Sequence, residues 1–218
     1  QRYADRLPIR RLFEPNPGKS HALNHAVREA RGDYIIWTDD DALVDPQWLQ
    51  SYFEAFNRWP EAAIFGGPVE PWFESEPPSW LTEAWPQIAA AYAVLDLGKE
   101  AAPLTEKRVP FGVNLAFRTS AQVLYSYDPE LGPNPNNTIR GEETTLIRRM
   151  LAAGETGWWV PGARIRHFIP SDRLTTQFLW ELYYGYGQFN ALKWHEEEIR
   201  RMESQSAPLS LYLLRREQ

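Results

Sequence analysis

The sequence lacks cysteine, long apolar runs and any excess of basic residues. Without cysteine it can form neither a disulfide framework nor a thiolate metal site, so oxygen and imidazole groups must supply the ligands of any bound metal. No segment reaches the roughly 18 apolar residues of a membrane-spanning helix, and we expect neither an integral membrane span nor a signal peptide. The net charge of −6 and the dispersed basic residues exclude the electrostatic footprint of a nucleic-acid-binding protein.

What the sequence does contain is the composition of a folded protein, with 43% hydrophobic and 24% charged residues among 218. A chain of this length buries a substantial core as one domain, or as one domain with a helical extension. Its ten tryptophans suit either a core or an apolar, sugar-facing wall. The lack of cysteine is compatible with a reducing compartment, so the expected location is the cytoplasm, free or peripheral at the cytoplasmic face of a membrane.

Short apolar runs alternate with segments of helical periodicity. Residues 34–38 are typical of a buried parallel strand, and apolar residues recur at helical spacing on each side of it, over 22–30 and 46–56. This alternation predicts an α/β fold, namely a three-layer sandwich with a mostly parallel central sheet. The other expected elements are strands at 8–13, 62–65, 109–118 and near 158 and 165, helices at 79–95, 141–153 and 174–203, and loops at 70–80 and 129–137.

The order of these elements also predicts the domain organisation. An open parallel sheet normally starts with a strand and a helix that help to build the ligand crevice, whereas Gln1 stands almost directly before what reads as a second strand. We therefore expect a sheet domain over 1–173 that lacks its N-terminal strand and helix. Residues 174–218 are expected to form a helical extension packed on the same domain.

Three consecutive acids, Asp39, Asp40 and Asp41, follow the apolar run that ends at Thr38. The carboxyl end of a buried strand is where open α/β sheets bind ligands. Adjacent carboxylates repel one another, and a divalent cation with a preference for oxygen ligands, such as magnesium, manganese or calcium, relieves that repulsion. The alternative is a solvated acidic turn that caps the helix beginning at Pro46.

Several segments, in this order along the chain, resemble the family 2 glycosyltransferases with the GT-A fold. The Asp-x-Asp element of that family falls on Asp39 and Asp41, so the resemblance implies contacts with the ribose and the metal-bound diphosphate of a nucleotide-sugar donor. It also implies donor binding by Lys19 and Asn24. An ATP-type phosphate loop at 18–20 is disfavoured because the spaced glycine of that motif is missing. The segments are 17–24 (PGKSHALN), 30–35 (ARGDYI), 39–41 (DDD) and 46–49 (PQWL).

Residues 110–118 (PFGVNLAFR) resemble the glycine-containing strand that lies against the donor sugar in this family. The resemblance places Gly112 beside the donor, and the amide of Asn114 could hydrogen-bond a sugar hydroxyl. Gly112 could equally mark a strand bulge. Glu142 and Glu143 open a helix, where the helix dipole favours acids, and they resemble the Glu-Asp motif whose second acid is the catalytic base. Because Glu replaces Asp at 143, the choice between Glu142 and Glu143 stays open.

Residues 164–170 (RIRHFIP) and Arg173 resemble the segment in which related enzymes place a histidine on the metal or near the diphosphate. His167 is therefore a candidate metal ligand with Asp41 and Asp39, since neutral imidazole is a common ligand, and a structural histidine is the alternative. Arg173 could pair with phosphate oxygens, or form only a surface salt bridge. Most aromatic residues over 178–194 are expected to be helix packing, and some of their rings could face the acceptor.

The predicted function is the transfer of a hexose-type unit from a nucleotide-diphosphate donor, expected to be of the UDP type, to an acceptor hydroxyl. One carboxylate would accept the proton while a divalent cation, Mn²⁺ or Mg²⁺, stabilises the leaving diphosphate, and direct displacement would invert the anomeric carbon. The acceptor could be a glycan, a lipid-linked sugar or a small molecule. The alternatives are a catalytically inactive nucleotide-sugar-binding domain, a metal-dependent phosphoesterase or nucleotidyltransferase, and a retaining mechanism on the same fold.

Overall fold

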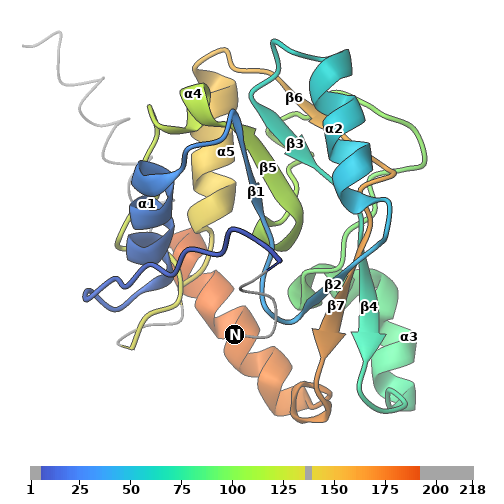
Figure 1. Cartoon of the computed structure of the whole chain (residues 1–218). Coiled ribbons are helices and arrows are strands. Elements are labelled where there is room, and N and C mark those ends of the chain that lie inside the picture. The colour runs from blue at the N-terminus through green and yellow to red at the C-terminus, as the bar shows by residue number, and fades with distance from the viewer. Residues whose placement is uncertain (1–5, 136–138, 192–218) are drawn as a thin grey trace, which may run out of the picture.

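The larger of two β-sheets forms the centre of the molecule (Figure 1). In the computed structural model, which describes residues 6–135 and 139–191, the strand order of this sheet is β1-β5-β3-β6. β5 is antiparallel to β1 and β3, and β3 is parallel to β6, so the expectation of a mostly parallel sheet was wrong and the sheet is mixed. The bounds are β1 Tyr34–Trp37, β3 Ile64–Gly66, β5 Leu115–Arg118 and β6 Gly157–Trp159.

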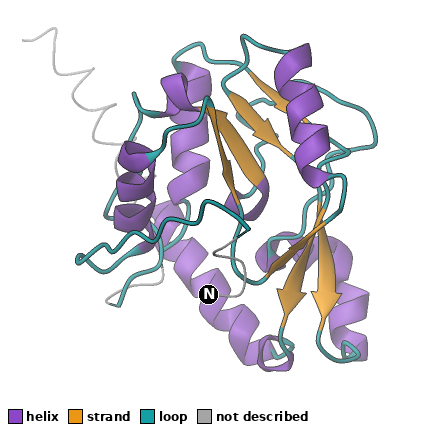
Figure 2. Cartoon of the chain, viewed as in Figure 1, coloured by secondary structure: helices purple, strands orange, loops and turns teal. Residues whose placement is uncertain are grey.

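A second sheet lies at one end of the first and has the order β2-β7-β4 (Figures 1 and 2). β7 (Ile165–Ile169) is antiparallel to β2 (Ala42–Val44) and parallel to β4 (Val69–Phe73). The loop expected at 70–80 therefore begins with a strand. β4 tolerates Pro71 because it lies at the edge of the sheet, where the missing N–H breaks no ladder of hydrogen bonds.

Helices cover both faces of the central sheet, which confirms the three-layer α/β architecture (Figure 2). α1 (Lys19–Glu29) and α5 (Glu142–Ala152) pack on one face, and α2 (Trp48–Arg58) packs on the other. The strands alternate accordingly: Ile64 is buried on the side of α1 and α5, whereas its neighbour Phe65 is buried on the side of α2.

An aromatic cluster attaches α2 to the sheet. The Tyr34 ring stacks on Phe56 with centroids 3.7 Å apart, and Phe65 meets Phe56 edge-on at 5.0 Å. Full burial of a side chain such as Phe65, which is 0% exposed, contributes about 1.5–3 kcal/mol to folding. The amphipathic pattern of 46–56 thus gave the correct helix, and Trp48, Tyr52 and Phe56 are buried as expected, whereas Leu49 and Phe53 are exposed.

The remaining helices surround the ends of the sheets. Residues 176–191 are helical and pack Phe178 and Leu179 against the cluster that α3 and η1 form, while the rest of the helix expected to 203 lies outside the described residues. The extended segment 8–13 is exposed and pairs with no described strand, so the strand expected there was wrong. Within the described ranges, no helix has the length and apolarity needed to cross a membrane. The bounds are α3 Ser79–Ile88, η1 Ala89–Tyr92, η2 Gly112–Asn114, α4 Thr119–Gln122 and η3 Ser171–Arg173.

Candidate active site

The acidic triplet lies where β1 ends and the chain turns into β2. Asp39 and Asp41 line a cleft of about 350 Å³, whereas Asp40 is exposed outside it. Burial raises the pKa of Asp39 above its ordinary value of 3.8; Lys19 opposes this rise, and the negative charges of Glu143 and Asp41 add to it. The turn therefore directs its first and third acids into the cleft and its second into solvent.

His167 reaches the same cleft from β7. Because Ala42 is paired with His167 in the ladder between β2 and β7, the imidazole lies next to Asp41, with Nε2 3.4 Å from Oδ1. The other ring nitrogen, Nδ1, is 2.8 Å from the Tyr92 carbonyl oxygen. A carbonyl can only accept, so Nδ1 carries a proton, and Nε2 is the ring nitrogen that faces the Asp41 carboxylate. Arg173 lies further out, 3.8 Å from Asp41 Oδ2.

This arrangement suits a divalent cation. Asp41 Oδ1 is buried and accepts no hydrogen bond from the residues that the structure describes, and His167 Nε2 lies 3.4 Å from it. The bond from Nδ1 to a backbone carbonyl is the usual way in which a metal-binding histidine is oriented. Within 6–135 and 139–191, no cluster of three or more acids and histidines is arranged to hold a metal. The chain would thus supply two ligands, leaving the other positions to substrate phosphates and water, as magnesium-type ions prefer.

The two acids at the start of α5 occupy different environments. Both acids line the cleft, but the Glu142 side chain is only 3% exposed, against 15% for Glu143, and among the described residues Glu142 Oε2 is buried without a hydrogen-bond partner. Burial and the negative charge of Glu143 raise the pKa of Glu142 to about 7, despite the opposing charge of Lys19. Of the two acids, Glu143 is thus the more exposed to the cleft.

Lys19, at the start of α1, reaches across to both acids. Its Nζ lies 2.6 Å from Glu143 Oε1 and 3.4 Å from Glu142 Oε1. Burial opposes the charge of this ammonium group, but Glu143, Asp39 and Glu142 together raise its pKa above the ordinary value of 10.5. In this structure the lysine that was expected to bind the donor is paired with the candidate base.

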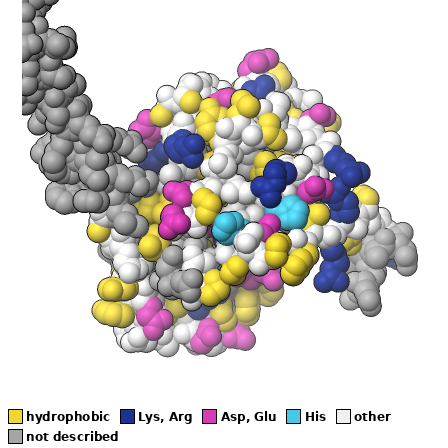
Figure 3. Space-filling view, turned by 90° about the vertical axis from the view of Figure 1, so that its left-hand side faces the viewer, with side chains coloured by type: hydrophobic (Ala, Val, Ile, Leu, Met, Phe, Trp, Pro, Cys, Tyr) yellow, Lys and Arg dark blue, Asp and Glu magenta, His cyan; other side chains and the backbone are white. Residues whose placement is uncertain are grey.

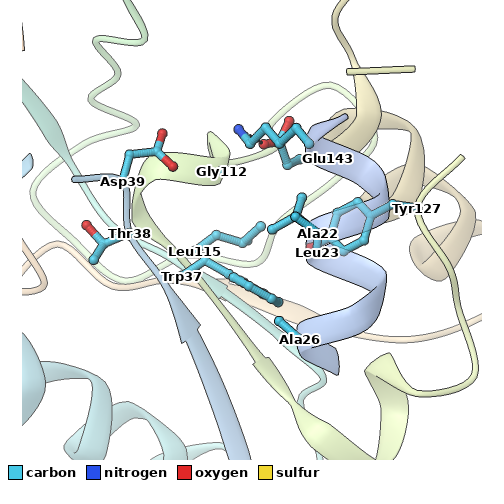
Figure 4. Close-up of a pocket in the computed structure, with 11 residues that line it drawn as sticks. Ala22, Leu23, Ala26, Trp37, Thr38, Asp39, Gly112, Leu115, Tyr127 and Glu143 are labelled. Carbon is cyan, nitrogen blue, oxygen red and sulfur yellow. Dashed lines mark hydrogen bonds and ion pairs between the residues drawn. The ribbon is translucent and has the colours of Figure 1, made fainter. Parts of the chain in front are cut away.

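Gly112 lies between the strand end and α5 (Figure 4). A Cβ atom at this position would collide with the Glu143 carboxylate, because the Glu143 side chain occupies that space. The sequence suggested a residue that makes room for the donor sugar. The structure shows that the absence of a side chain at Gly112 makes room first for Glu143.

Asn114 does not face the cleft. Its side chain is fully buried, and its Oδ1 accepts hydrogen bonds from Trp48 Nε1 and the Tyr52 hydroxyl, both at 2.8 Å. Its Nδ2 donates to the carbonyls of Pro68 at 2.9 Å and Ala163 at 2.7 Å. All four hydrogen-bonding positions of the amide are therefore in use, which leaves none for the sugar hydroxyl proposed from the sequence.

Asn24 is also engaged inside the protein. Its Nδ2 donates to the Tyr127 carbonyl and its Oδ1 accepts from the Tyr127 N–H, both at 2.8 Å. This reciprocal pair attaches the segment after α4 to α1. Asn24 thus shapes the wall of the site, since Tyr127 lines the pocket beside Lys19.

Among the cleft residues that the sequence did not single out as site candidates, Arg140 and Tyr186 carry side chains able to contact a polar ligand. Arg140 directly precedes the Gly-Glu-Glu segment, a position that could have indicated it. Tyr186 lies in the aromatic stretch that was assigned to helix packing, and helical periodicity alone does not show which ring faces a cleft. Burial raises the pKa of Tyr186, and the nearby Arg140 opposes this effect.

An apolar pocket of about 330 Å³ adjoins the cleft under α1 (Figure 4). The two spaces share Lys19, Asp39, Gly112 and Glu143, which form a polar rim above a floor that includes Trp37 and Leu115. Figure 3 shows the α1 side of the molecule, where acidic, basic and histidine side chains lie close together among apolar ones. A ligand with a charged part and an apolar, planar part would match this combination.

Comparison with known proteins places the chain in a family. The model of glycosyl transferase family 2 matches residues 1–120. The glucosyl-dolichyl phosphate glucuronosyltransferase of Haloferax volcanii is 23% identical over 177 residues, covering 80% of this chain and 55% of the relative. The succinoglycan biosynthesis protein ExoM of Rhizobium meliloti is 25% identical over 174 residues, covering 80% and 52%. The chain thus spans about half the length of the curated relatives it matches.

The fold has a counterpart among solved structures. GalNAc-T7, crystallised with UDP, GalNAc and Mn²⁺, aligns with 72% of this chain and 31% of its own chain, at a TM-score of 0.50 and 13% sequence identity. This likeness concerns the fold and agrees with the GT-A architecture expected from the sequence. Because the family model covers more than half of its residues, the chain belongs to glycosyl transferase family 2.

Proposed function

We propose that this chain transfers a hexose-type unit from a nucleoside-diphosphate sugar to an acceptor hydroxyl, with inversion at the anomeric carbon. The observation that carries the proposal is one cleft with two chemically different ends. Asp41 and His167 stand at one end as a pair of electron donors suited to a cation. Glu143 stands at the other end as an accessible carboxylate.

The donor would bind at the first end. Asp39 and Asp41 would contact the ribose and the metal-bound diphosphate, His167 would complete the protein ligands of Mn²⁺ or Mg²⁺, and the cation would supply Lewis-acid stabilisation of the leaving diphosphate. Arg173 is 3.8 Å from Asp41 and 39% exposed at its side chain, so its guanidinium is available to phosphate oxygens as well.

Glu143 would act as the general base at the other end. As the acceptor oxygen forms its bond to the anomeric carbon, the bond between that carbon and the diphosphate oxygen breaks and the acceptor proton passes to the Glu143 carboxylate. The entering and leaving oxygens stand on opposite faces of the sugar, so a single displacement inverts the configuration. Glu142 is too deeply buried to take this role.

The relatives support a carbohydrate acceptor. One is named for a dolichyl phosphate-linked glucose and the other for succinoglycan biosynthesis. We propose a glycan or lipid-linked acceptor, reached from the cytoplasmic side of a membrane, and a UDP-type donor. UDP with Mn²⁺, the ligands in the GalNAc-T7 crystal, is the natural first probe.

Calorimetric titration with UDP and Mn²⁺, followed by product analysis with a panel of UDP-sugars, tests the proposal. Asp41→Asn should weaken Mn²⁺-dependent UDP binding by about 10-fold or more, because it removes charge from a metal ligand. Asp40→Asn is the matched control and should bind as the unmodified chain does, since Asp40 lies outside the cleft. Equal binding by the two variants, or binding that ignores Mn²⁺, would contradict the cation site.

A further inference from the structure

Three groups from three parts of the chain meet at the base end of the cleft. Lys19 begins α1, Glu142 and Glu143 begin α5, and Gly112 begins η2. The ammonium group of Lys19 touches one oxygen, Oε1, of Glu143 at 2.6 Å. The same ammonium group lies 3.4 Å from Glu142 Oε1. The lysine thus stands between the two carboxylates and is in closer contact with Glu143.

Glu142 and Glu143 both lie close to the Lys19 ammonium group, but they differ in their exposure to solvent. The Glu142 side chain is 3% exposed and the Glu143 side chain 15%, and the lysine stands 0.8 Å nearer to Glu143 than to Glu142, the difference between 3.4 and 2.6 Å. Negative charge is therefore better stabilised on Glu143, and a shared proton is better placed on Glu142. The raised pKa of Glu142, about 7, agrees with this division.

Two glycines leave the space that this arrangement needs. A Cβ at Gly112 would overlap the Glu143 carboxylate. A Cβ at Gly132, whose φ of +91° already disfavours other residues, would press on Ser20 Oγ at 3.1 Å and on the Glu142 carboxyl carbon at 3.3 Å. The acids are thus confined on both sides, and their positions depend on the lysine between them.

Other titratable groups also surround Glu143, but they are not paired with it. Asp39 faces it from the end of β1, Tyr127 from the segment after α4, Arg140 from the residues before α5, and Tyr186 from the helix at 176–191. Among the ion pairs of the described residues, the pairs that involve Glu143 and Glu142 are both made by Lys19. This cation is therefore the group able to distinguish the two acids.

We propose that Lys19 is a positioning residue that selects Glu143, rather than Glu142, as the carboxylate that accepts the proton of the acceptor hydroxyl. The inference rests on the proposed function and adds to it a residue whose role in the sequence resemblance was donor binding. As the new glycosidic bond forms and the bond from the anomeric carbon to the diphosphate oxygen breaks, the proton leaves the acceptor oxygen and is taken by the Glu143 carboxylate. Lys19 stays protonated throughout and does not itself accept the proton.

A carboxyl titration tests the selection without any need for activity. In protein labelled with ¹³C at the glutamate side-chain carboxyl, Glu142→Gln and Glu143→Gln assign the two signals. In Lys19→Met the midpoint of Glu143 should rise by about 1–3 pH units, the usual effect of removing an opposite charge at contact distance. Lys19→Arg should restore it, and Lys107→Met, a change at an exposed lysine, should leave it unmoved.

The inference would be overturned if the titration midpoint of Glu143 did not change in Lys19→Met. For this comparison Lys19→Arg must be folded and must show the same midpoint as the unmodified chain. Transfer kinetics separate this failure from failure of the proposed function. If Glu143→Gln transfers sugar as well as the unmodified chain does, the base assignment itself is wrong. If Glu143→Gln is inactive while Lys19→Met keeps the same acid limb of kcat against pH, the base stands and the selecting role of Lys19 is wrong. An acid limb that moves upward in Lys19→Met, and returns in Lys19→Arg, supports both.

Discussion

Replacing Asn114 by leucine distinguishes a structural amide from a donor-binding one. Leucine has a similar size but no polar atoms, so it leaves the indole N–H of Trp48, the hydroxyl of Tyr52 and the carbonyls of Pro68 and Ala163 without their partner. These four groups come from α2, from the link between β3 and β4, and from the turn before β7. The substitution therefore loosens the junction between the two sheets rather than one contact.

The magnitude follows from the number of hydrogen bonds. A typical intramolecular hydrogen bond contributes about 0.5–1.5 kcal/mol, so four of them give a loss of about 2–6 kcal/mol. Since a domain of this kind is stable by about 5–15 kcal/mol, the variant should be strongly destabilised and could be partly unfolded at 37 °C. The aspartate variant should suffer as well, because it loses both donated bonds and buries a charge.

Urea denaturation at 20 °C, followed by tryptophan fluorescence, measures this loss. Asn57→Ala is the matched control: Asn57 makes one exposed hydrogen bond, from Nδ2 to the Phe53 carbonyl at 2.8 Å, and its loss should cost less than about 0.5 kcal/mol. UDP binding by the folded fraction of Asn114→Leu should stay close to normal. A stable Asn114→Leu protein with greatly weakened UDP binding would refute the structural role and return Asn114 to the donor site.

Three further predictions concern the cleft. Gly112→Ala should lower kcat by about 100-fold and leave UDP binding unchanged, because the new Cβ would push the Glu143 carboxylate out of its position. Transfer kinetics measure the first effect and calorimetric titration with UDP measures the second. The raised pKa of Glu142 means that its stabilising contribution is fully present below pH 4.5 and is lost as pH rises through about 7, in total about 3 kcal/mol. Urea midpoints should therefore fall between pH 5 and 8, and fall less in Glu142→Gln; parallel curves would contradict the buried neutral acid. His167→Ala should weaken Mn²⁺-dependent UDP binding by about 10–100-fold, whereas an effect that persists without Mn²⁺ would make the histidine structural.

The features that sequence predicted well are local. The apolar run before Asp39 predicted β1, and helical spacing predicted the helices α1 and α2, although part of each predicted apolar face is exposed. Because ligands bind at the carboxyl ends of such strands, the position of the acids in the cleft followed from the order of elements alone. These inferences need only the neighbours of a residue along the chain.

The features that sequence did not predict depend on tertiary contacts. Nothing in residues 115–118 specifies that β5 runs against its neighbours, because a buried strand has the same apolar pattern in either direction. The hydrogen bonds of Asn114 join residues 46 to 66 positions apart, so its burial could not be read locally. The difference between the environments of Glu142 and Glu143 likewise depends on a lysine far earlier in the sequence.

The ion pair between Lys19 and Glu143 joins residues 124 positions apart in the sequence. During synthesis on a ribosome, Lys19 and the acidic triplet therefore emerge well before Glu143. Neither end of the cleft can form until α5 and β7 have also been synthesised. Contacts of such high sequence separation form late and slow the folding of a domain. A fragment that stops at residue 120, where the family match ends, would contain Asp39 and Asp41 but would lack both Glu143 and His167.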